Sequence, residues 1–202
     1  MEENELEEIV FKFFILGDSN VGKTSIIFKY LNIDKEKVNH SIGLELFKKE
    51  LSKNENSKII FKIWDCSGQK RFRDVAATYC KSKDGAFIVY DITNRKSFES
   101  IDELANLVRK NNSQTSPIVL IGNKTDLKDE RKISLKSGAD LAKENGFIFM
   151  ESSCKDNYNV SDAFTTLIEM TNSELIKTNN RKNFKLKDTT NNTKEKENKK
   201  CC

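Results

Sequence analysis

The sequence predicts an α/β fold: a mostly parallel sheet of about six strands, one of them antiparallel, flanked by about five helices. Short apolar runs of strand length alternate with stretches of helical periodicity, as expected when parallel strands are buried on both faces. Residues 44–51 and 58–65 also have strand patterns, but the short polar turn between them leaves no room for a crossover helix. We therefore expect these two strands to pair antiparallel.

The remaining elements follow from the spacing of apolar residues along the chain. Apolar runs predict strands at residues 9–16, 85–92, 117–122 and 147–150. Apolar side chains at helical spacing predict helices over residues 23–31, 98–108, 135–145 and 160–168. Asn145 and Gly146 form a typical helix stop. After about residue 176 the periodicity ends, so we expect a flexible extension there.

Length and charge predict one domain with a tail. A chain of 202 residues is long enough for one domain with a sizeable core. We divide it into an acidic N-terminal extension (residues 1–8), the domain (9–176) and a flexible basic tail (177–202). The tail holds nine Lys or Arg and three Asp or Glu, although the whole chain carries only +4. This placement argues against a nucleic-acid-binding domain and for a tail that meets an anionic surface, although a plain solvated tail has the same composition.

Several other classes are excluded by composition. No stretch approaches the ~18 consecutive apolar residues of a membrane span. The acidic start is unlike a signal or transit peptide, and Glu2 excludes N-myristoylation. The cysteine spacing fits no zinc site, and without a signal peptide we expect reduced thiols in the cytosol. The five cysteines are Cys66, Cys80, Cys154, Cys201 and Cys202.

Residues 17–24, GDSNVGKT, match the pattern G-x-x-x-x-G-K-[ST] between an apolar strand and a helical segment. This context predicts a loop that binds the phosphates of a nucleoside triphosphate, and so the P-loop NTPase fold. Consecutive backbone N–H groups and the start of the helix would point at the anion. Lys23 would supply a mobile positive charge, and Thr24 a hydroxyl ligand for Mg²⁺. The nucleotide-binding residues expected here are Ser19, Asn20, Val21, Gly22, Lys23, Thr24 and Ser25.

A second motif predicts which base is bound. Asn123, Lys124 and Asp126 stand directly after an apolar strand, where side chains face the ligand crevice of a parallel sheet. A carboxylate such as Asp126 accepts two hydrogen bonds, which suits the N1–H and 2-amino group of guanine but not adenine. The residues after the next strand can close the base pocket with backbone N–H groups. These are Ser153, Cys154 and Lys155.

A third group predicts the chemistry at the outer phosphate. Asp65 ends the strand IIFKIWD and is placed to hold Mg²⁺. Gly68 would let a backbone N–H approach the γ-phosphate. Gln69 would orient the water that attacks it, and we therefore assign Gln69 the catalytic role. The sequence thus predicts binding of GTP or GDP with Mg²⁺, and hydrolysis of GTP.

Together these residues resemble the Ras superfamily of small GTPases, and within it the Rab family. The resemblance covers roughly residues 9–176 and the extreme C-terminus. It implies that residues 9–176 are a GTPase domain with slow hydrolysis unless an activating protein supplies an arginine, since no Arg is evident in cis. The Rab-like features are Ile42-Gly43, the FKIW of residues 61–64, the RFR of residues 71–73, Tyr79, and the IVYDIT of residues 88–93.

The resemblance implies a switch between GTP and GDP states. GTP with Mg²⁺ would order two loops, near residues 32–43 and 67–80, and hydrolysis would release them. It also implies that Ser41 is a nucleotide contact and a third metal ligand, at a position where the family usually has Thr. The effector-facing residues implied by the resemblance are Leu46, which replaces a Phe, Trp64 and Tyr79.

The terminal pair Cys201-Cys202 is similar to the doubly geranylgeranylated ends of Rabs. This implies a lipidated monomer on the cytoplasmic face of an intracellular membrane, with a cytosolic pool and a role in vesicle traffic. The partners implied are an exchange factor, an activating protein, an escort protein with its prenyltransferase, and a GDP-dissociation inhibitor. No nucleic-acid partner is implied.

Departures from the family pattern leave an alternative open. Ser41 lacks the methyl group of Thr, and Lys70 stands where Glu is usual. At the guanine edge an aromatic side chain is missing, and only Ile33, Lys35 or His40 lies nearby. The departures in the first switch favour a nucleotide-locked adaptor with little hydrolysis, whereas intact Asp65 and Gln69 favour a hydrolysing switch. Lys70 bears instead on which exchange and activating proteins act. A P-loop kinase would not need the Asn-Lys-x-Asp motif.

Overall fold

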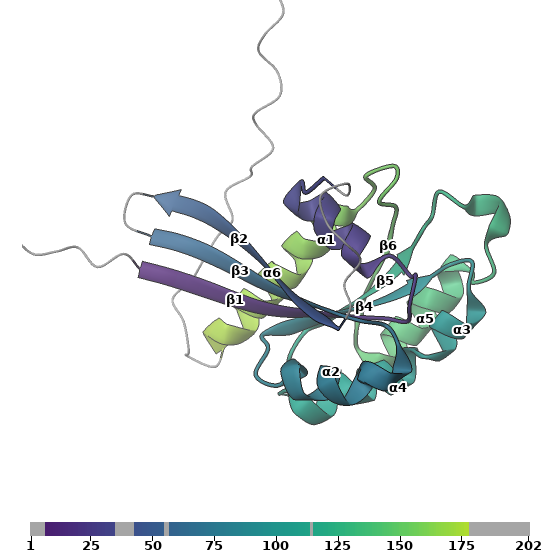
Figure 1. Cartoon of the computed structure of the whole chain (residues 1–202), viewed down its shortest axis with the longest axis horizontal. Helices are drawn as coiled ribbons and strands as arrows, with labels where there is room; N and C mark the ends of the chain where they lie inside the picture. Colours follow the sequence, from purple (N-terminus) through teal and green to yellow (C-terminus); the bar gives the residue numbers. More distant parts are fainter. Residues whose placement is uncertain (1–6, 35–42, 55–56, 114, 178–202) are drawn as a thin grey trace, which may run out of the picture.

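The computed structural model describes residues 7–34, 43–54, 57–113 and 115–177, which form one twisted sheet with helices on both faces (Figure 1). The six strands lie in the order β2-β3-β1-β4-β5-β6. Every neighbouring pair is parallel except β2 and β3, which pair antiparallel. The predicted fold class is therefore confirmed. The strands are β1 (Glu7–Leu16), β2 (Leu44–Asn54), β3 (Ser57–Cys66), β4 (Gly85–Asp91), β5 (Ile118–Asn123) and β6 (Ile148–Ser152).

Six α-helices are present in the described ranges, and a single residue, Ser100, separates α3 from α4. With that pair taken together, five helical segments flank the sheet, as predicted. Gly146 adopts the left-handed conformation and ends α5 where the sequence predicted a stop. The helices are α1 (Lys23–Leu31), α2 (Arg73–Cys80), α3 (Arg95–Glu99), α4 (Ile101–Asn111), α5 (Leu135–Asn145) and α6 (Val160–Lys177).

The sheet separates two hydrophobic layers, and β1 contributes to both because alternate side chains point to opposite faces. Phe11, Phe13 and Ile15 face the layer formed with α1 and α6. Phe14 and Leu16 face the layer formed with α2, α4 and α5. Burial on both faces is the physical reason that β1 is a continuous apolar run rather than an alternating one.

Several strand boundaries differ from the sequence prediction. β1 begins at Glu7, two residues early, and β2 continues to Asn54, inside the predicted turn, with an irregularity in pairing between Ser52 and Asn54. β6 spans Ile148–Ser152 rather than residues 147–150. Polar residues occupy these strand ends, so apolar patterning alone stops too early.

The segment 67–80, taken in the prediction as a loop, contains a helix. A 3₁₀ turn spans Lys70–Phe72, and α2 follows directly. Only Ala76 and Cys80 of α2 are buried, whereas Val75 and Tyr79 are exposed. A helix that buries so few side chains gives almost no apolar periodicity, and it is stabilised by packing against α4 rather than by a strong sequence signal.

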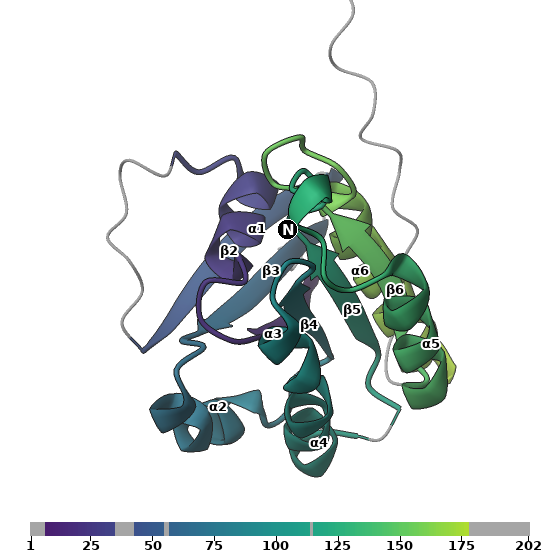
Figure 2. The same ribbon diagram turned by 90° about the vertical axis from the view of Figure 1, so that its right-hand side faces the viewer.

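This topology brings functional segments together at one end of the sheet. Parallel strands β1, β3, β4, β5 and β6 all end there, and each is followed by a predicted motif or its support. Figure 2 shows the loops after these strands gathered at one end of the molecule, beside the start of α1. The crevice at the carboxyl ends of such strands is the usual ligand site in open α/β sheets.

Candidate nucleotide-binding site

The phosphate loop connects β1 to α1 with the backbone turns that its glycines allow. Gly22 has a φ of 99°, and a Cβ there would lie 2.3 Å from Nδ2 of Asn123. Asn20 also has a positive φ, 65°, in the left-handed region that Asn tolerates better than most residues. Gly22 is therefore required both for its backbone conformation and for the close approach of Asn123.

Lys23 lies across this loop and is only 6% exposed. Its Nζ donates to the carbonyl oxygens of Gly17, at 3.0 Å, and Asp18, at 2.8 Å. Burial lowers the pKa of the Lys23 ammonium, and the negative charge of Asp65 opposes that shift. An ammonium has three N–H groups, so a third remains for a phosphate oxygen once two hold the loop.

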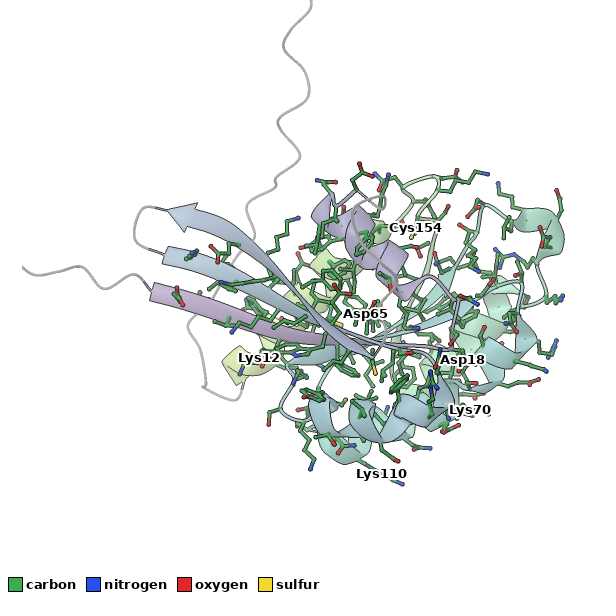
Figure 3. All side chains as sticks on the ribbon, in the orientation of Figure 1. Lys12, Asp18, Asp65, Lys70, Lys110 and Cys154 are labelled. Atoms are coloured by element: carbon green, nitrogen blue, oxygen red, sulfur yellow. The ribbon has the colours of Figure 1, made fainter. Side chains whose placement is uncertain are left out.

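Thr24 and Asp65 meet beside Lys23, as predicted for a magnesium site. The Thr24 hydroxyl donates to Oδ2 of Asp65. Asp65, which is labelled in Figure 3, is 1% exposed. Its Oδ1 is buried without a hydrogen-bond partner among the described residues. Burial raises the pKa of Asp65, and the Thr24 bond and the charge of Lys23 partly oppose that shift.

These groups fit Mg²⁺, which binds through hydroxyl and carboxylate oxygens together with phosphate oxygens of its nucleotide. An unsatisfied buried carboxylate oxygen calls for a ligand or ion to complete it. Within the described ranges no group of three or more His, Cys, Asp and Glu side chains is arranged to hold a metal ion. Thr24 and Asp65 are therefore the candidate ligands that the structure brings together, and Ser41 lies outside the described residues.

Gly68 lies directly against the phosphate loop. A Cβ at this position would come within 2.2 Å of the carbonyl carbon of Asp18 and 2.3 Å of the backbone nitrogen of Ser19. Any side chain here would collide with backbone that cannot move aside. Gln69 is exposed at the start of the 3₁₀ turn, so the candidate catalytic residue directly follows, in sequence, the glycine that lies against the phosphate loop.

Sequence reasoning missed a network centred on Asp18. Its Oδ2 accepts a hydrogen bond from the Ser100 hydroxyl at 2.8 Å, and its Oδ1 lies 3.5 Å from the guanidinium of Arg73. Arg73 also forms an ion pair with Glu103 of α4. These contacts tie the phosphate loop to α2 and α4. The sequence did hold one sign of this network, which is a carboxylate within a loop that binds phosphate. Such a charge repels the phosphate unless cations neutralise it.

Asn123 joins the base motif to the phosphate loop. It is 2% exposed, its Nδ2 donates to the carbonyl oxygen of Val21 at 2.8 Å, and its Oδ1 accepts from the Ser152 hydroxyl at 3.1 Å. Both ends of the amide are satisfied by groups of the protein. Asn123 therefore acts in this structure as a brace between β5, β6 and the phosphate loop.

The other base-motif residues are also held in place. Oδ1 of Asp126 accepts from the Ser153 hydroxyl at 2.8 Å. Lys124 has a φ of 69°, and its Nζ lies 2.6 Å from Oδ2 of Asp91 at the end of β4. Burial alone raises the pKa of Asp91, but hydrogen bonds from Lys124 and Thr93 lower it overall, so the carboxylate stays ionised. The motif is thus preformed.

A cavity of about 330 Å³ opens next to these residues, between the end of α1 and the turn after β6. It brings predicted Ser25 and Cys154 together, while Lys155 is exposed in the adjoining turn. Ile33 lies in its wall, at the edge where the family has an aromatic side chain; Lys35 and His40 lie outside the described residues. The lining residues are Ser25, Phe28, Lys29, Asn32, Ile33, Asp34 and Cys154.

Comparison with known proteins identifies the family of this chain. The model of the Ras family matches residues 12–173. The chain belongs to the Ras family. It is 36% identical to the bovine (Bos taurus) Ras-related protein Rab-3C over 164 residues, which cover 81% of this chain and 72% of that protein. It is 35% identical to human Rab-3A, with coverage of 81% and 74%. It is 36% identical to RABA5a of Arabidopsis thaliana over 169 residues, with coverage of 83% and 76%.

The protein is thus a small GTPase of the Rab type, a hydrolase that binds GTP and GDP. The residues predicted to face its effectors lie on three elements, β2, β3 and α2. Leu46 of β2 is 51% exposed and is paired across the sheet with Trp64 of β3. Tyr79 of α2 is 47% exposed. The structure thus places Leu46 beside Trp64 and leaves all three accessible to different degrees.

A second support that sequence reasoning missed holds the end of β6, next to the predicted base-binding residues. Arg131 makes two hydrogen bonds to the carboxylate of Glu151, at 2.6 Å and 2.9 Å. Asn159 donates to the carbonyl oxygen of Glu151 at 2.9 Å. These bonds fix the end of β6, from which Ser152 and Ser153 reach Asn123 and Asp126. Little in the sequence indicated this pairing, because Arg131 and Glu151 are too far apart in the chain for their spacing to form a recognisable pattern.

The predicted lipidation sites Cys201 and Cys202 lie outside the described residues, as does the tail from residue 178. Among the helices that the structure describes, none has the length and apolar character needed to cross a bilayer.

Proposed function

We propose that this small GTPase is a membrane-anchored switch in intracellular vesicle traffic that alternates between GTP and GDP. The observation that carries the proposal is the meeting of Lys23, Thr24 and Asp65 beneath a loop whose other side is braced by Asn123. One arrangement therefore offers a counter-charge, metal ligands and a base-recognition motif. The Rab names of its relatives support the assignment to vesicle traffic.

In the proposed reaction an oxygen of water attacks the γ-phosphorus and the bond to the β-phosphate oxygen breaks, giving GDP and phosphate. Gln69 would orient that water, because it is exposed beside Gly68 at the loop. Lys23 and the backbone N–H groups of the loop would stabilise charge on the phosphate oxygens. Bound to Thr24 and Asp65, Mg²⁺ would supply further neutralisation of the β- and γ-phosphates.

The switch would act through the contact between Gly68 and the phosphate loop. Gly68 touches the backbone of Asp18 and Ser19, and α2 begins a few residues later. Arg73 links α2 to Asp18 and Glu103. A γ-phosphate that moves Gly68 would therefore shift α2 and its exposed Tyr79, which is how nucleotide state would reach a partner.

The first test is single-turnover hydrolysis of bound GTP by the full chain, with Gln69→Leu as the matched variant. Measurable hydrolysis that falls roughly ten-fold or more in the variant, with nucleotide affinity retained, supports the hydrolysing switch. Retained GTP with no difference between the two proteins, even with a membrane extract as a source of activating protein, supports the adaptor alternative instead.

The membrane anchor is tested separately. We propose that Cys201 and Cys202 carry lipids and that the basic tail adds attraction to anionic headgroups, because a single chain gives only marginal membrane residence. Replacing both cysteines by serine should leave GTP binding intact and move the protein to the cytosolic fraction. Equal membrane pelleting of the variant and the wild type would contradict this anchor. We also propose an exchange factor, an activating protein, an escort protein and a GDP-dissociation inhibitor as regulators.

A further inference from the structure

Three lysines form a row across the outer strands of the sheet. Lys48 of β2 is directly opposite Lys62 of β3, and Lys62 is directly opposite Lys12 of β1. Residues opposite one another in neighbouring strands share a face, and strands lie about 4.8 Å apart. The face is that of Phe14 and Leu16, on the side of α2 and α4. The outer ends of these three strands project past α2 (Figure 1).

This row lies beside apolar side chains. The adjacent row contains Leu46 and Trp64, which is paired in turn with Phe14. The ammonium of Lys83 lies 4.3 Å from the centre of the Trp64 ring and adds a further positive charge. We call the surface made by Leu46, Trp64 and the three lysines Lys12, Lys48 and Lys62 the lysine face.

The charges of the lysine face are incompletely neutralised. Lys48 pairs with Glu50 at 2.6 Å, and the hydrogen bonds from Lys48 and Lys58 lower the pKa of Glu50 to about 2. Lys12 is exposed and Lys62 is half-buried, and neither ammonium has an ion pair or hydrogen bond with another residue in the part of the chain described. Like charges directly opposite in a sheet repel one another. A binding partner with carboxylates would relieve that repulsion.

Leu46 and Trp64 are already expected to contact effectors. We propose that the lysine row beside them binds Asp or Glu side chains of the docked protein segment and so selects acidic partners. This inference rests on the proposed switch, because β2 and β3 lead to the segments that would respond to nucleotide. An α-helix suits the row, since its side chains at i, i+4 and i+7 lie on one face at spacings similar to those of the strands.

An anionic membrane fits this face less well. Lipid recognition typically takes a cluster of four to eight basic residues without nearby acids. Here Glu50 follows Lys48 on the same face, Asp84 accepts a hydrogen bond from the backbone N–H of Lys12, and Glu8 lies opposite Lys58. These carboxylates border the row on several sides and would repel phosphate headgroups. A protein segment can place its carboxylates between them, whereas a lipid surface cannot.

The test uses an unbiased library of helical-hairpin binders, selected on the full chain loaded with a non-hydrolysable GTP analogue. Binders that also bind Leu46→Ala/Trp64→Ala are removed, so that those left use this surface. Their affinities are then measured for the triple variant Lys12→Gln/Lys48→Gln/Lys62→Gln. The matched control is Lys110→Gln/Lys136→Gln/Lys143→Gln, which removes three exposed lysines from α4 and α5. Nucleotide binding by each variant is checked with a fluorescent GTP analogue.

We expect the selected binders to be enriched in Asp and Glu. They should lose about ten-fold or more in affinity on the triple variant, and less than two-fold on the control. The difference should shrink as salt is raised. Binders that use Leu46 and Trp64 but ignore the lysines would overturn the inference. A second result would also overturn it: no acidic binder is recovered, and the wild type, but not the triple variant, binds phosphatidylserine vesicles. Equal binding in GDP and GTP forms would instead count against the proposed switch.

Discussion

The two ends of the nucleotide site are built differently. At the base end, Asn123 and Asp126 have hydrogen-bond partners within the protein. At the phosphate end, Asp65 keeps a buried oxygen without a partner among the described residues. A buried polar atom without a partner destabilises the ligand-free protein, and a ligand that supplies the partner removes that cost. The base end is therefore preorganised for recognition, whereas the phosphate end depends on its ligand for completion.

The charges differ in the same way. Lys124 at the base end is matched by Asp91, whose pKa is lowered overall by that pairing. Burial lowers the pKa of Lys23 at the phosphate end and raises that of Asp65, so both are shifted toward their neutral forms. Bound phosphate and metal would favour the charged forms and so oppose both shifts. Variants at either end should accordingly weaken ligand binding, whereas loss of the brace between the ends should lower stability.

The largest effect is expected at the phosphate end. Lys23→Asn removes the buried counter-charge, and we expect GTP affinity to fall by about 100-fold or more. Equilibrium binding of a fluorescent GTP analogue in magnesium buffer measures it. Lys136→Asn, at an exposed position on α5, is the control and should bind as the wild type does. Unchanged affinity for Lys23→Asn would remove this residue from the site.

At the base end, Asp126→Asn should change the preferred base from guanine to xanthine. An amide no longer matches the two donors of guanine, and we expect roughly a 100-fold loss of GTP affinity with a gain for xanthosine triphosphate. Oδ1 of the new amide can still accept from Ser153, so the pocket should stay folded. Competition between the two triphosphates is the measurement, and a loss for both would indicate damage to the pocket instead.

The hydrogen bonds of Asn123, which join the two ends, should contribute to the stability of the fold. Asn123→Ala leaves the carbonyl of Val21 and the hydroxyl of Ser152 without their partner, and we expect a loss of about 2–3 kcal/mol in the free energy of unfolding. Urea denaturation of the nucleotide-free protein measures it. Asn106→Ala, on the exposed side of α4, provides the comparison and should change stability little. Equal stability of the two variants would show that the brace contributes nothing.

The smallest expected effect concerns Ser41. A methyl group restored by Ser41→Thr and buried on loop closure contributes about 1 kcal/mol, which changes an open–closed ratio by roughly five-fold. Ser41→Ala should shift it the other way. Phosphorus NMR of a bound non-hydrolysable GTP analogue reports these populations. Identical spectra for all three proteins would show that Ser41 is not the switch ligand.

The sequence by itself determined the parts that depend on local pattern. The phosphate loop needs Gly22 and Lys23 at fixed spacing, and the apolar run of β1 needs burial on both faces, so both could be recognised without a structure. The order of elements then predicted that the base motif and the phosphate loop would meet at one end of the sheet. The antiparallel pairing of β2 with β3 followed from the short turn between them.

Only the tertiary structure decided which side chains complete one another across the fold. The bond from Asn123 to Val21 joins residues 102 positions apart, and Asp18 is 82 positions from Ser100. Such partners have no spacing rule, because they are set by strand order and helix packing. Helix α2 escaped prediction for the same reason: it buries little of its own surface and is held by α4. The lysine row likewise became visible only once the register aligned three separate lysines on one face.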